Sequence, residues 1–293
     1  MKLSFCTIAF RHQLVSFERL VEFACRQRFD GIELWGAHAV ALAGSERERT
    51  SRQLAIMHSR GLRVTMLSDY LDIADDARFE ATVRKLRQLA QLARWYGTDR
   101  IRTFAGSKPS ADVADGEREA YAARLRALSG ICADYGLQLL TETHPNTLSD
   151  NLASTRRLLE EVEHPNFGVN LDFLHLWEAG DDPLTSYAAL KPKVGHFHMK
   201  NVAAADRLTV FAPDQVYAPS GSREGMVPLS QGVLDYAPIL AAIRDSDLFA
   251  SLEWFGGEPF RVLEEDRNWI EASGGIEAAP TLYWTAAGAG AGV

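Results

Sequence analysis

Four side chains of the types that bind divalent metals lie at the ends of four apolar segments. Glu142 closes LQLLTE, Asp172 closes FGVNLD, His198 closes VGHFH and Glu253 closes FASLE. In a barrel of parallel strands, the carboxyl ends of the strands meet on one face, where active sites are built. Three carboxylates and one imidazole that meet there would bind a divalent cation. The sequence therefore predicts a metal site formed by these four residues.

The identity of the metal follows from the ligand atoms. Carboxylate oxygens suit Mg²⁺ or Mn²⁺, and a single imidazole shifts the preference to Mn²⁺. Co²⁺ and Zn²⁺ are alternatives, although structural zinc would usually recruit cysteine. Arg102 and Lys200, also on predicted strands, would more than balance the charge of the site. Together they would bind a substrate carboxylate or an enolate oxygen.

Two further histidines lie within three residues of a predicted ligand. They are His144 in ETHPNT and His175 in NLDFLHLW. Because imidazole titrates near neutrality, either is a candidate general base, a role worth roughly 10²–10⁴ in rate. Tyr70 in SDYLDI and Tyr217 would supply hydroxyl donors.

Each of these residues also has a structural explanation. An acid at the end of a strand often caps the following helix. His144 would then only orient the neighbouring ligand, and His175 would stack with Trp177. Arg102 would pair with a ligand carboxylate, and Lys200 would lie at a solvated rim. Four metal-binding side chains on four consecutive strands favour the functional explanation.

The elements that must position these residues follow from the alternation of short apolar segments with longer amphipathic ones. The apolar segments predict eight strands, at 2–8, 31–35, 62–67, 100–104, 137–142, 167–172, 194–200 and 249–254. The amphipathic segments predict helices at 16–28, 46–60, 77–96, 116–135, 152–162, 183–191 and 235–245. Ser16 is a candidate N-cap, and Gly97 follows a helix in a C-cap position. Strands that alternate with helices in this way predict an α/β fold, a (β/α)8 TIM barrel. Glu33, on the second strand, is interpreted as a structural acid inside the barrel.

No linker divides the chain. Residues 1–273 are expected to form a single barrel domain, and the Ala/Gly-rich residues 274–293 a C-terminal tail. The longest irregular segment, 201–234, is rich in proline and glycine. Loops of this length are often functional. On this fold the loop between the seventh strand and its helix would lie over the site.

Composition excludes several classes of protein. The 293 residues carry a net charge of −8, from 31 basic and 39 acidic residues, without a basic block, so a nucleic-acid partner is not expected. The three cysteines are scattered and predict reduced thiols in a cytoplasmic protein. No apolar run reaches the length of a membrane span, and MKLSFCTIAF predicts a strand, not a signal peptide. The expected partner is a small carboxylate substrate, and the sequence is compatible with a homodimer.

Longer motifs resemble a known enzyme family. The bacterial 3-dehydroshikimate dehydratases of petrobactin siderophore biosynthesis are similar to this chain from about Met1 to about Phe260. The motifs that carry the resemblance most specifically are RTFAG, ETHPNT, NLDFLH and the KN pair at 200–201. Those enzymes belong to the xylose-isomerase-like TIM-barrel superfamily, which the resemblance implies for this chain.

The resemblance also implies a reaction and the residues that carry it. The implied metal is typically manganese, and the residues that would hold it are Glu142, Asp172, His198 and Glu253. The implied enzyme is a hydro-lyase that dehydrates 3-dehydroshikimate to 3,4-dihydroxybenzoate (protocatechuate) through an enolate. Arg102 would anchor the ring carboxylate, and Lys200 would stabilise the enolate. His144 is a candidate base, but in related dehydratases the histidine three positions past the aspartate ligand, here His175, is favoured. Tyr217 or a protonated histidine would help the hydroxyl to leave.

Aromatic side chains would wall the planar ring of this substrate. They are Tyr70, Phe104, Trp177 and Phe211. The resemblance does not separate siderophore assembly from quinate or shikimate breakdown, because both use the same step.

Three other functions compete with this one. A metal-dependent ketose epimerase or sugar isomerase of the same superfamily would use metal-bridging acids as bases and would not need Arg102 for a carboxylate. An abasic-site endonuclease would need more histidine ligands and a basic face, which the net charge disfavours. A non-catalytic binding module is disfavoured by the intact ligand set and the two additional histidines.

Overall fold

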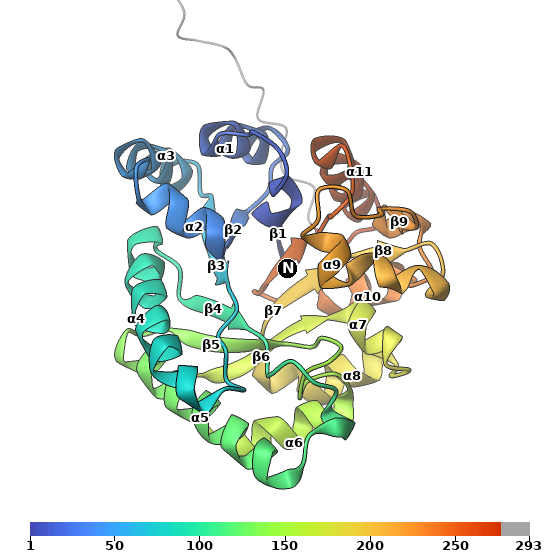
Figure 1. Cartoon of the computed structure of the whole chain (residues 1–293). Helices are drawn as coiled ribbons and strands as arrows, with labels where there is room; N and C mark the ends of the chain where they lie inside the picture. The colour runs from blue at the N-terminus through green and yellow to red at the C-terminus, as the bar shows by residue number, and fades with distance from the viewer. Residues whose placement is uncertain (277–293) are drawn as a thin grey trace, which may run out of the picture.

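The computed structural model describes residues 1–276 and shows a closed barrel of eight parallel strands. Going round the barrel, the strands follow one another in the order β1, β10, β7, β6, β5, β4, β3 and β2 (Figure 1). Their bounds are β1 (Lys2–Cys6), β2 (Gly31–Trp35), β3 (Arg63–Ser68), β4 (Arg100–Thr103), β5 (Gln138–Glu142), β6 (Phe167–Asp172), β7 (Val194–Met199) and β10 (Phe249–Leu252). All eight coincide with the predicted strands to within a few residues. The predicted TIM barrel is confirmed.

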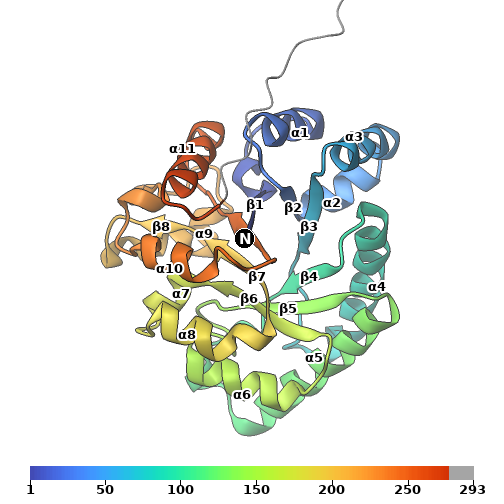
Figure 2. The ribbon, with the colours of Figure 1, turned by 180° about the vertical axis from the view of Figure 1, so that it is seen from behind.

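A ring of helices surrounds the barrel (Figure 2). The helices that the sequence predicted are α1 (Phe17–Arg26), α3 (Arg47–Ser59), α4 (Phe79–Tyr96), α5 (Asp115–Asp134), α6 (Leu152–Val162), α8 (Pro183–Leu190) and α10 (Tyr236–Ile243). The predicted start of α1 is confirmed, because the Ser16 side chain accepts a hydrogen bond from the Arg19 N–H. The end of α4 is also as predicted: Gly97 has φ 74°, a left-handed conformation that glycine adopts without steric cost.

Outside segment 201–234, three helices of the described residues were not predicted. They are α2 (Gly36–Ala43), α7 (Phe173–Glu178) and α11 (Pro259–Ala272). The sequence of α2, GAHAVALA, is apolar on most sides and gives no amphipathic period. Helix α7 has only six residues and directly follows a strand, so its apolar residues extend the apolar run of β6. Helix α11 had a detectable signal, since Pro259 occupies its first turn and Val262, Leu263 and Ile270 face the core.

The segment 201–234 has more structure than the sequence predicted. It contains β8 (Asn201–Val202), η5 (Ala205–Phe211), α9 (Pro213–Val216), β9 (Met226–Val227) and η6 (Leu229–Gln231), and β8 pairs with β9 in an antiparallel ladder. The Asn201 amide holds the end of the segment by donating to the carbonyls of Leu229 and Leu234, each at 2.8 Å. A Cβ at Gly232 would lie 2.0 Å from the Asn201 Cγ, so this approach requires glycine. Figure 1 shows α9 lying over the mouth of the barrel.

The predicted tail, 274–293, falls almost entirely outside the described residues, which end at Ile276. Within 1–276, no helix is long and apolar enough to cross a membrane. The cysteines Cys6, Cys25 and Cys132 are free.

Asp266 in α11 is a buried acid that supports segment 201–234. Its Oδ1 accepts a hydrogen bond of 2.7 Å from the Leu229 N–H, and the residue is 5% exposed. Burial raises the pKa of Asp266 to about 7. Between roughly pH 4 and pH 7 the folded protein therefore keeps a proton that the unfolded chain has lost. Ionisation of Asp266 thus costs stability, increasingly as the pH rises through this window, and by a constant amount above it.

Asp266→Asn is expected to stabilise the protein at high pH but not at low pH. The amide keeps an oxygen for the Leu229 N–H and cannot ionise. The free energy of unfolding at pH 8 should therefore rise by on the order of 2–4 kcal/mol. At pH 4 this rise should be close to zero. Urea unfolding at both pH values measures the difference, with Glu264→Gln, an exposed neighbour, as control. An equal effect of Asp266→Asn at the two pH values would contradict the argument.

Candidate active site

Four buried side chains converge at the carboxyl ends of four neighbouring strands. Glu142 ends β5, Asp172 ends β6, His198 lies one residue before the end of β7, and Glu253 follows β10. These strands are adjacent in the barrel, and one ligand atom from each residue lies within 4.8 Å of the others. We call these four residues the acidic cluster. Three carboxylate oxygens and one imidazole nitrogen form a donor set that suits a divalent cation. The predicted convergence is therefore present, and binding of the metal stays a prediction.

Asp172 shows how a helix cap and a metal ligand can be the same residue. Its Oδ1 accepts hydrogen bonds from the N–H groups of Leu174 and His175, at 3.0 and 3.2 Å, and so caps α7. Its Oδ2 lies 2.5 Å from the Lys200 Nζ and accepts no other hydrogen bond. The structural explanation considered for strand-end acids thus applies to one oxygen, while the other oxygen faces the cluster.

Lys200 is a buried cation against the acidic cluster. Its Nζ lies 2.5 Å from the Asp172 Oδ2 and 2.7 Å from the Glu253 Oε2, and the residue is 4% exposed. Burial alone would lower the pKa of Lys200, but the carboxylates of Asp172, Glu253 and Glu142 raise it well above its usual value. Lys200 therefore stays protonated, which makes it a donor and a fixed positive charge. The alternative of a solvated rim lysine is wrong.

Arg102 on β4 is paired with the cluster. Its Nε lies 2.9 Å from the Glu142 Oε2, and both side chains are 2% exposed. The guanidinium also lies 5.3 Å from the Tyr70 ring centroid and 5.0 Å from that of Phe104. This ion pair is the structural explanation that the sequence analysis gave for Arg102, namely pairing with a ligand carboxylate. The Arg102 Nη1 has no hydrogen-bond partner among the described residues, so a donor is left for a substrate carboxylate.

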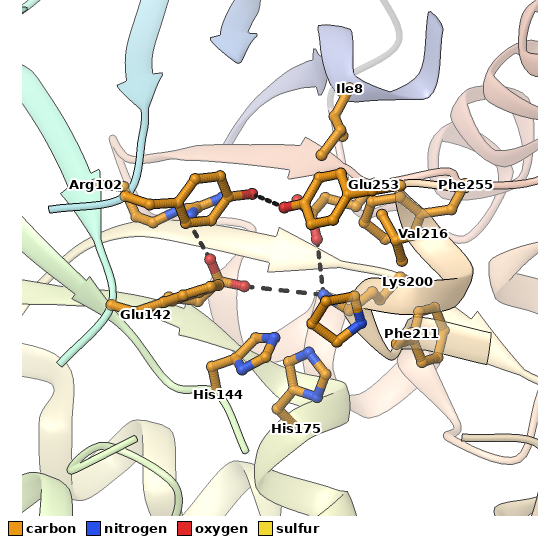
Figure 3. Close-up of a pocket in the computed structure, with 14 residues that line it drawn as sticks. Ile8, Arg102, Glu142, His144, His175, Lys200, Phe211, Val216, Glu253 and Phe255 are labelled. Carbon is orange, nitrogen blue, oxygen red and sulfur yellow. Dashed lines mark hydrogen bonds and ion pairs between the residues drawn. The ribbon is translucent and has the colours of Figure 1, made fainter. Parts of the chain in front are cut away.

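Both candidate bases line the same pocket, and their rings lie 4.5 Å apart between centroids (Figure 3). The His175 Nδ1 lies 2.8 Å from the Glu178 Oε2, and its buried Nε2 has no hydrogen-bond partner among the described residues. The His144 Nδ1 lies 2.8 Å from the Pro145 carbonyl. Because a carboxylate and a carbonyl can only accept, each Nδ1 carries the hydrogen and each Nε2 offers a lone pair.

The two histidines differ in what supports a positive charge on the ring. Burial and the neighbouring His175 lower the pKa of His144 to about 3. The His144 ring is therefore neutral throughout the neutral range. The His175 ring faces the Glu178 carboxylate, which would stabilise the imidazolium that forms when His175 takes a proton. Glu178, three residues on in α7, was not singled out from the sequence.

Two tyrosines cover the pocket. The Tyr217 hydroxyl donates to that of Tyr70 at 2.5 Å, and the Tyr217 ring stacks on Trp35 with the centroids 6.2 Å apart. The Arg11 Nε donates to the Val216 carbonyl at 2.6 Å, which fixes α9 beside the tyrosines. The space between the lining side chains measures about 50 Å³.

The pocket lining contains most of the side chains singled out from the sequence, but not Trp177. The residues around it are Ile8, Tyr70, Arg102, Phe104, Glu142, His144, His175, Lys200, Phe211, Pro213, Val216, Tyr217, Glu253 and Phe255. Trp177 was predicted to wall the substrate, and stacking on Trp177 was the structural alternative for His175. Trp177 is not among the lining residues, and the described residues show no ring contact between the two. Residues two apart on a helix face different sides. While His175 faces the pocket, Trp177 packs against the hydrophobic core. Ile8, Pro213, Val216 and Phe255 were missed because apolar residues in turns carry no signal of a site.

A family profile decides the classification. The profile of the xylose isomerase-like TIM barrel family matches residues 22–273. The chain belongs to this family. The match spans seven of the eight barrel strands and all four residues of the acidic cluster.

Individual members of the family show how close the similarity is. The 3-dehydroshikimate dehydratase of Bacillus anthracis is 51% identical over 266 residues, which cover 91% of this chain and 95% of that enzyme. A crystal structure of the probable 3-DHS dehydratase involved in petrobactin synthesis from the same organism matches with a TM-score of 0.91 and 50% identity, covering 92% of this chain and 98% of that one. A xylose isomerase-like protein from Mycobacterium smegmatis, solved in complex with magnesium, matches with a TM-score of 0.65 and 20% identity over 93% and 96% of the two chains. That last likeness shows the fold alone.

Proposed function

We propose that this protein is a divalent-metal-dependent 3-dehydroshikimate dehydratase that forms 3,4-dihydroxybenzoate. The observation that carries the proposal is the 51% identity to the Bacillus anthracis dehydratase, which extends over 91% of the chain. The pocket supports it independently, because it combines an acidic cluster with two imidazoles and a buried arginine. Those groups are what a metal-assisted elimination from a carboxylate substrate needs.

The acidic cluster would hold the metal. The ligands would be Glu142, Asp172, His198 and Glu253, whose donor atoms already lie within 4.8 Å of one another. A divalent cation bound there would act as a Lewis acid towards the substrate ketone and hydroxyl oxygens. Mn²⁺ is the metal that we expect, because three carboxylates are joined by one imidazole, and Mg²⁺ or Co²⁺ would be alternatives.

The first step is removal of a proton from the carbon next to the ketone. The electron pair of the C–H bond becomes the double bond of an enolate, and the proton goes to a histidine Nε2. We assign this role to His175, whose Nε2 is free and whose Nδ1 is held by Glu178 at 2.8 Å. Lys200, a fixed positive charge in a buried site, would stabilise the developing enolate.

The second step breaks the C–O bond of the neighbouring carbon. The hydroxyl leaves as water after taking a proton, and transfer of one proton from the ring methylene group to the ketone oxygen then makes the ring aromatic. Tyr217 or the protonated histidine would supply the proton to the leaving hydroxyl. Burial raises the pKa of Tyr217, so its hydroxyl keeps a hydrogen to donate.

Substrate orientation would depend on the arginine and the aromatic wall. Arg102 keeps its Nη1 free for the ring carboxylate, beside the rings of Tyr70 and Phe104. Phe211 lines the pocket beside Lys200, with the Nζ 5.6 Å from its ring centroid. Holding the planar substrate between these groups would place its acidic C–H bond near the two imidazoles. We place the reaction in the cytoplasm, where free thiols such as Cys6 and Cys132 stay reduced.

Purified protein that has been treated with a chelator and refilled with single metals provides the test. With 3-dehydroshikimate, we expect an increase in ultraviolet absorbance from the aromatic product, restored best by Mn²⁺ and absent without metal. The control is the chelator-treated protein with added Ca²⁺, a larger ion that prefers more ligands. Epimerisation of a ketose without turnover of 3-dehydroshikimate would favour the sugar epimerase instead. Equal activity of stripped and loaded protein would contradict both functions.

A further inference from the structure

A buried carboxylate outside the acidic cluster contacts His198 on the side of the ring that faces away from the cluster. Glu33 lies on β2, across the barrel from His198, and both are fully buried. The His198 Nε2 is 3.1 Å from one Glu33 carboxylate oxygen and 3.0 Å from the other. The His198 Nδ1 points the opposite way, 3.4 Å from the Oε1 atoms of Glu142 and Glu253. The imidazole therefore has one nitrogen on the cluster and the other on Glu33.

Glu33 is itself held in place. The Ser68 hydroxyl donates to its Oε1, and the His196 Nε2 lies 3.4 Å from its Oε2. His196 is in turn 2.8 Å from the Ser251 hydroxyl. All of these side chains are buried in the interior of the barrel. A carboxylate with contacts on both oxygens cannot turn away from His198 without breaking several of them.

We propose that Glu33 is a positioning residue that makes His198 a competent metal ligand. A carboxylate only accepts hydrogen bonds, so Glu33 requires the hydrogen of the imidazole to sit on Nε2. The lone pair of Nδ1 is then directed at the acidic cluster, where the cation would bind. A hydrogen bond of this kind fixes the ring orientation and increases the basicity of the ligand nitrogen. The inference rests on the metal site of the proposed function, and it concerns binding of the metal instead of turnover.

A second arrangement of the same residues is less favoured. Glu33, His196 and His198 offer ligand atoms close enough to one another to hold a cation of their own. That site would be fully buried beneath the acidic cluster and would have to displace the hydrogen bonds that His198 and Ser68 make to Glu33. The positioning role keeps these contacts.

Glu33→Gln tests the proposal with little change of volume. The glutamine amide can donate to Nε2 and so favours the tautomer with the hydrogen on Nδ1, which blocks the ligand position. We expect the Kd of chelator-stripped protein for Mn²⁺ to rise by about 10–100-fold, the range for loss of such a partner. Nitrogen-15 NMR of protein loaded with diamagnetic Mg²⁺ should show the hydrogen of His198 on Nε2 and none on Nδ1 in the wild type, and a hydrogen on Nδ1 in the variant. A Kd within twofold of the wild-type value would overturn the proposal.

Two further variants complete the experiment. Ser4→Ala removes a 2.8 Å contact with Ser251 in the same interior and should leave the Kd for Mn²⁺ unchanged. Ser68→Ala frees one Glu33 oxygen but keeps its charge, so a rise of about fivefold is expected, and this variant replaces Glu33→Gln if the latter does not fold. Two ions bound per wild-type chain, with one lost in Glu33→Gln, would overturn the positioning role in favour of a second cation site. Normal Mn²⁺ binding without turnover of 3-dehydroshikimate would contradict the proposed function and leave the positioning role of Glu33 intact.

Discussion

Glu253→Gln is expected to abolish tight metal binding and dehydratase activity together. The change keeps the volume of the side chain but removes one of the three negative charges that face the cation, and it leaves Lys200 without its 2.7 Å partner. Metal catalysis typically contributes several kcal/mol to the transition state. A fall in kcat/KM of roughly 10²–10⁴ at limiting Mn²⁺ is therefore expected. Metal content after gel filtration and initial rates with 3-dehydroshikimate measure the two effects on one sample.

The chain offers a matched control a few residues away. Glu258 follows the same strand, but its side chain is 71% exposed and pairs with Arg261 on the surface. Glu258→Gln should leave metal content and rate unchanged. If Glu253→Gln retained wild-type metal stoichiometry and affinity, Glu253 would be removed from the ligand set. If Glu253→Gln loses its near-ultraviolet circular dichroism, its tertiary structure is disrupted, and the comparison is then made with Glu142→Gln.

The acidic cluster was predictable because, in a barrel of parallel strands, a residue at the carboxyl end of a strand lies on a known face of the barrel. A polar residue at the end of an apolar strand cannot be packing material, and the carboxyl ends of parallel strands share one face. Glu142, Asp172, His198 and Glu253 each satisfied that condition without reference to the others. The prediction of Arg102 and Lys200 used the same reasoning, and both side chains reach the cluster.

Contacts between elements far apart in sequence were not predictable in the same way. Glu33 is 165 residues from His198, and nothing in GIELW separates an acid that supports a histidine from one that only fills space. The wrong position for Trp177 has a different cause. The predicted strand ended at Asp172 and no helix was predicted after it, whereas the chain turns into helix α7 at Phe173 and Trp177 packs against the core. Helix start signals are weak when the N-cap, Asp172, is also a strand-end residue.

His175→Ala is expected to cost far more activity than His144→Ala. The His175 Nε2 is unpartnered within the described residues and its ring is backed by Glu178, so loss of this base should lower kcat by about 10²–10⁴. His144 has a pKa of about 3 and is a weak base, so His144→Ala should cost roughly tenfold through lost packing beside Phe104. Added imidazole should partly restore His175→Ala, because the substitution leaves space where the ring was.

The pH dependence distinguishes a base from a packing residue. With a pKa of about 3, His144 is already neutral at pH 5, so its protonation cannot produce a loss of rate between pH 5 and pH 8. Any acid limb in that range should therefore survive in His144→Ala. Glu178→Gln should lower kcat with little effect on KM, because it weakens support for the imidazolium and touches no substrate. His58→Ala, on an exposed face of α3, is the control and should match the wild type. A larger loss in His144→Ala than in His175→Ala, with rescue by imidazole, would transfer the base to His144.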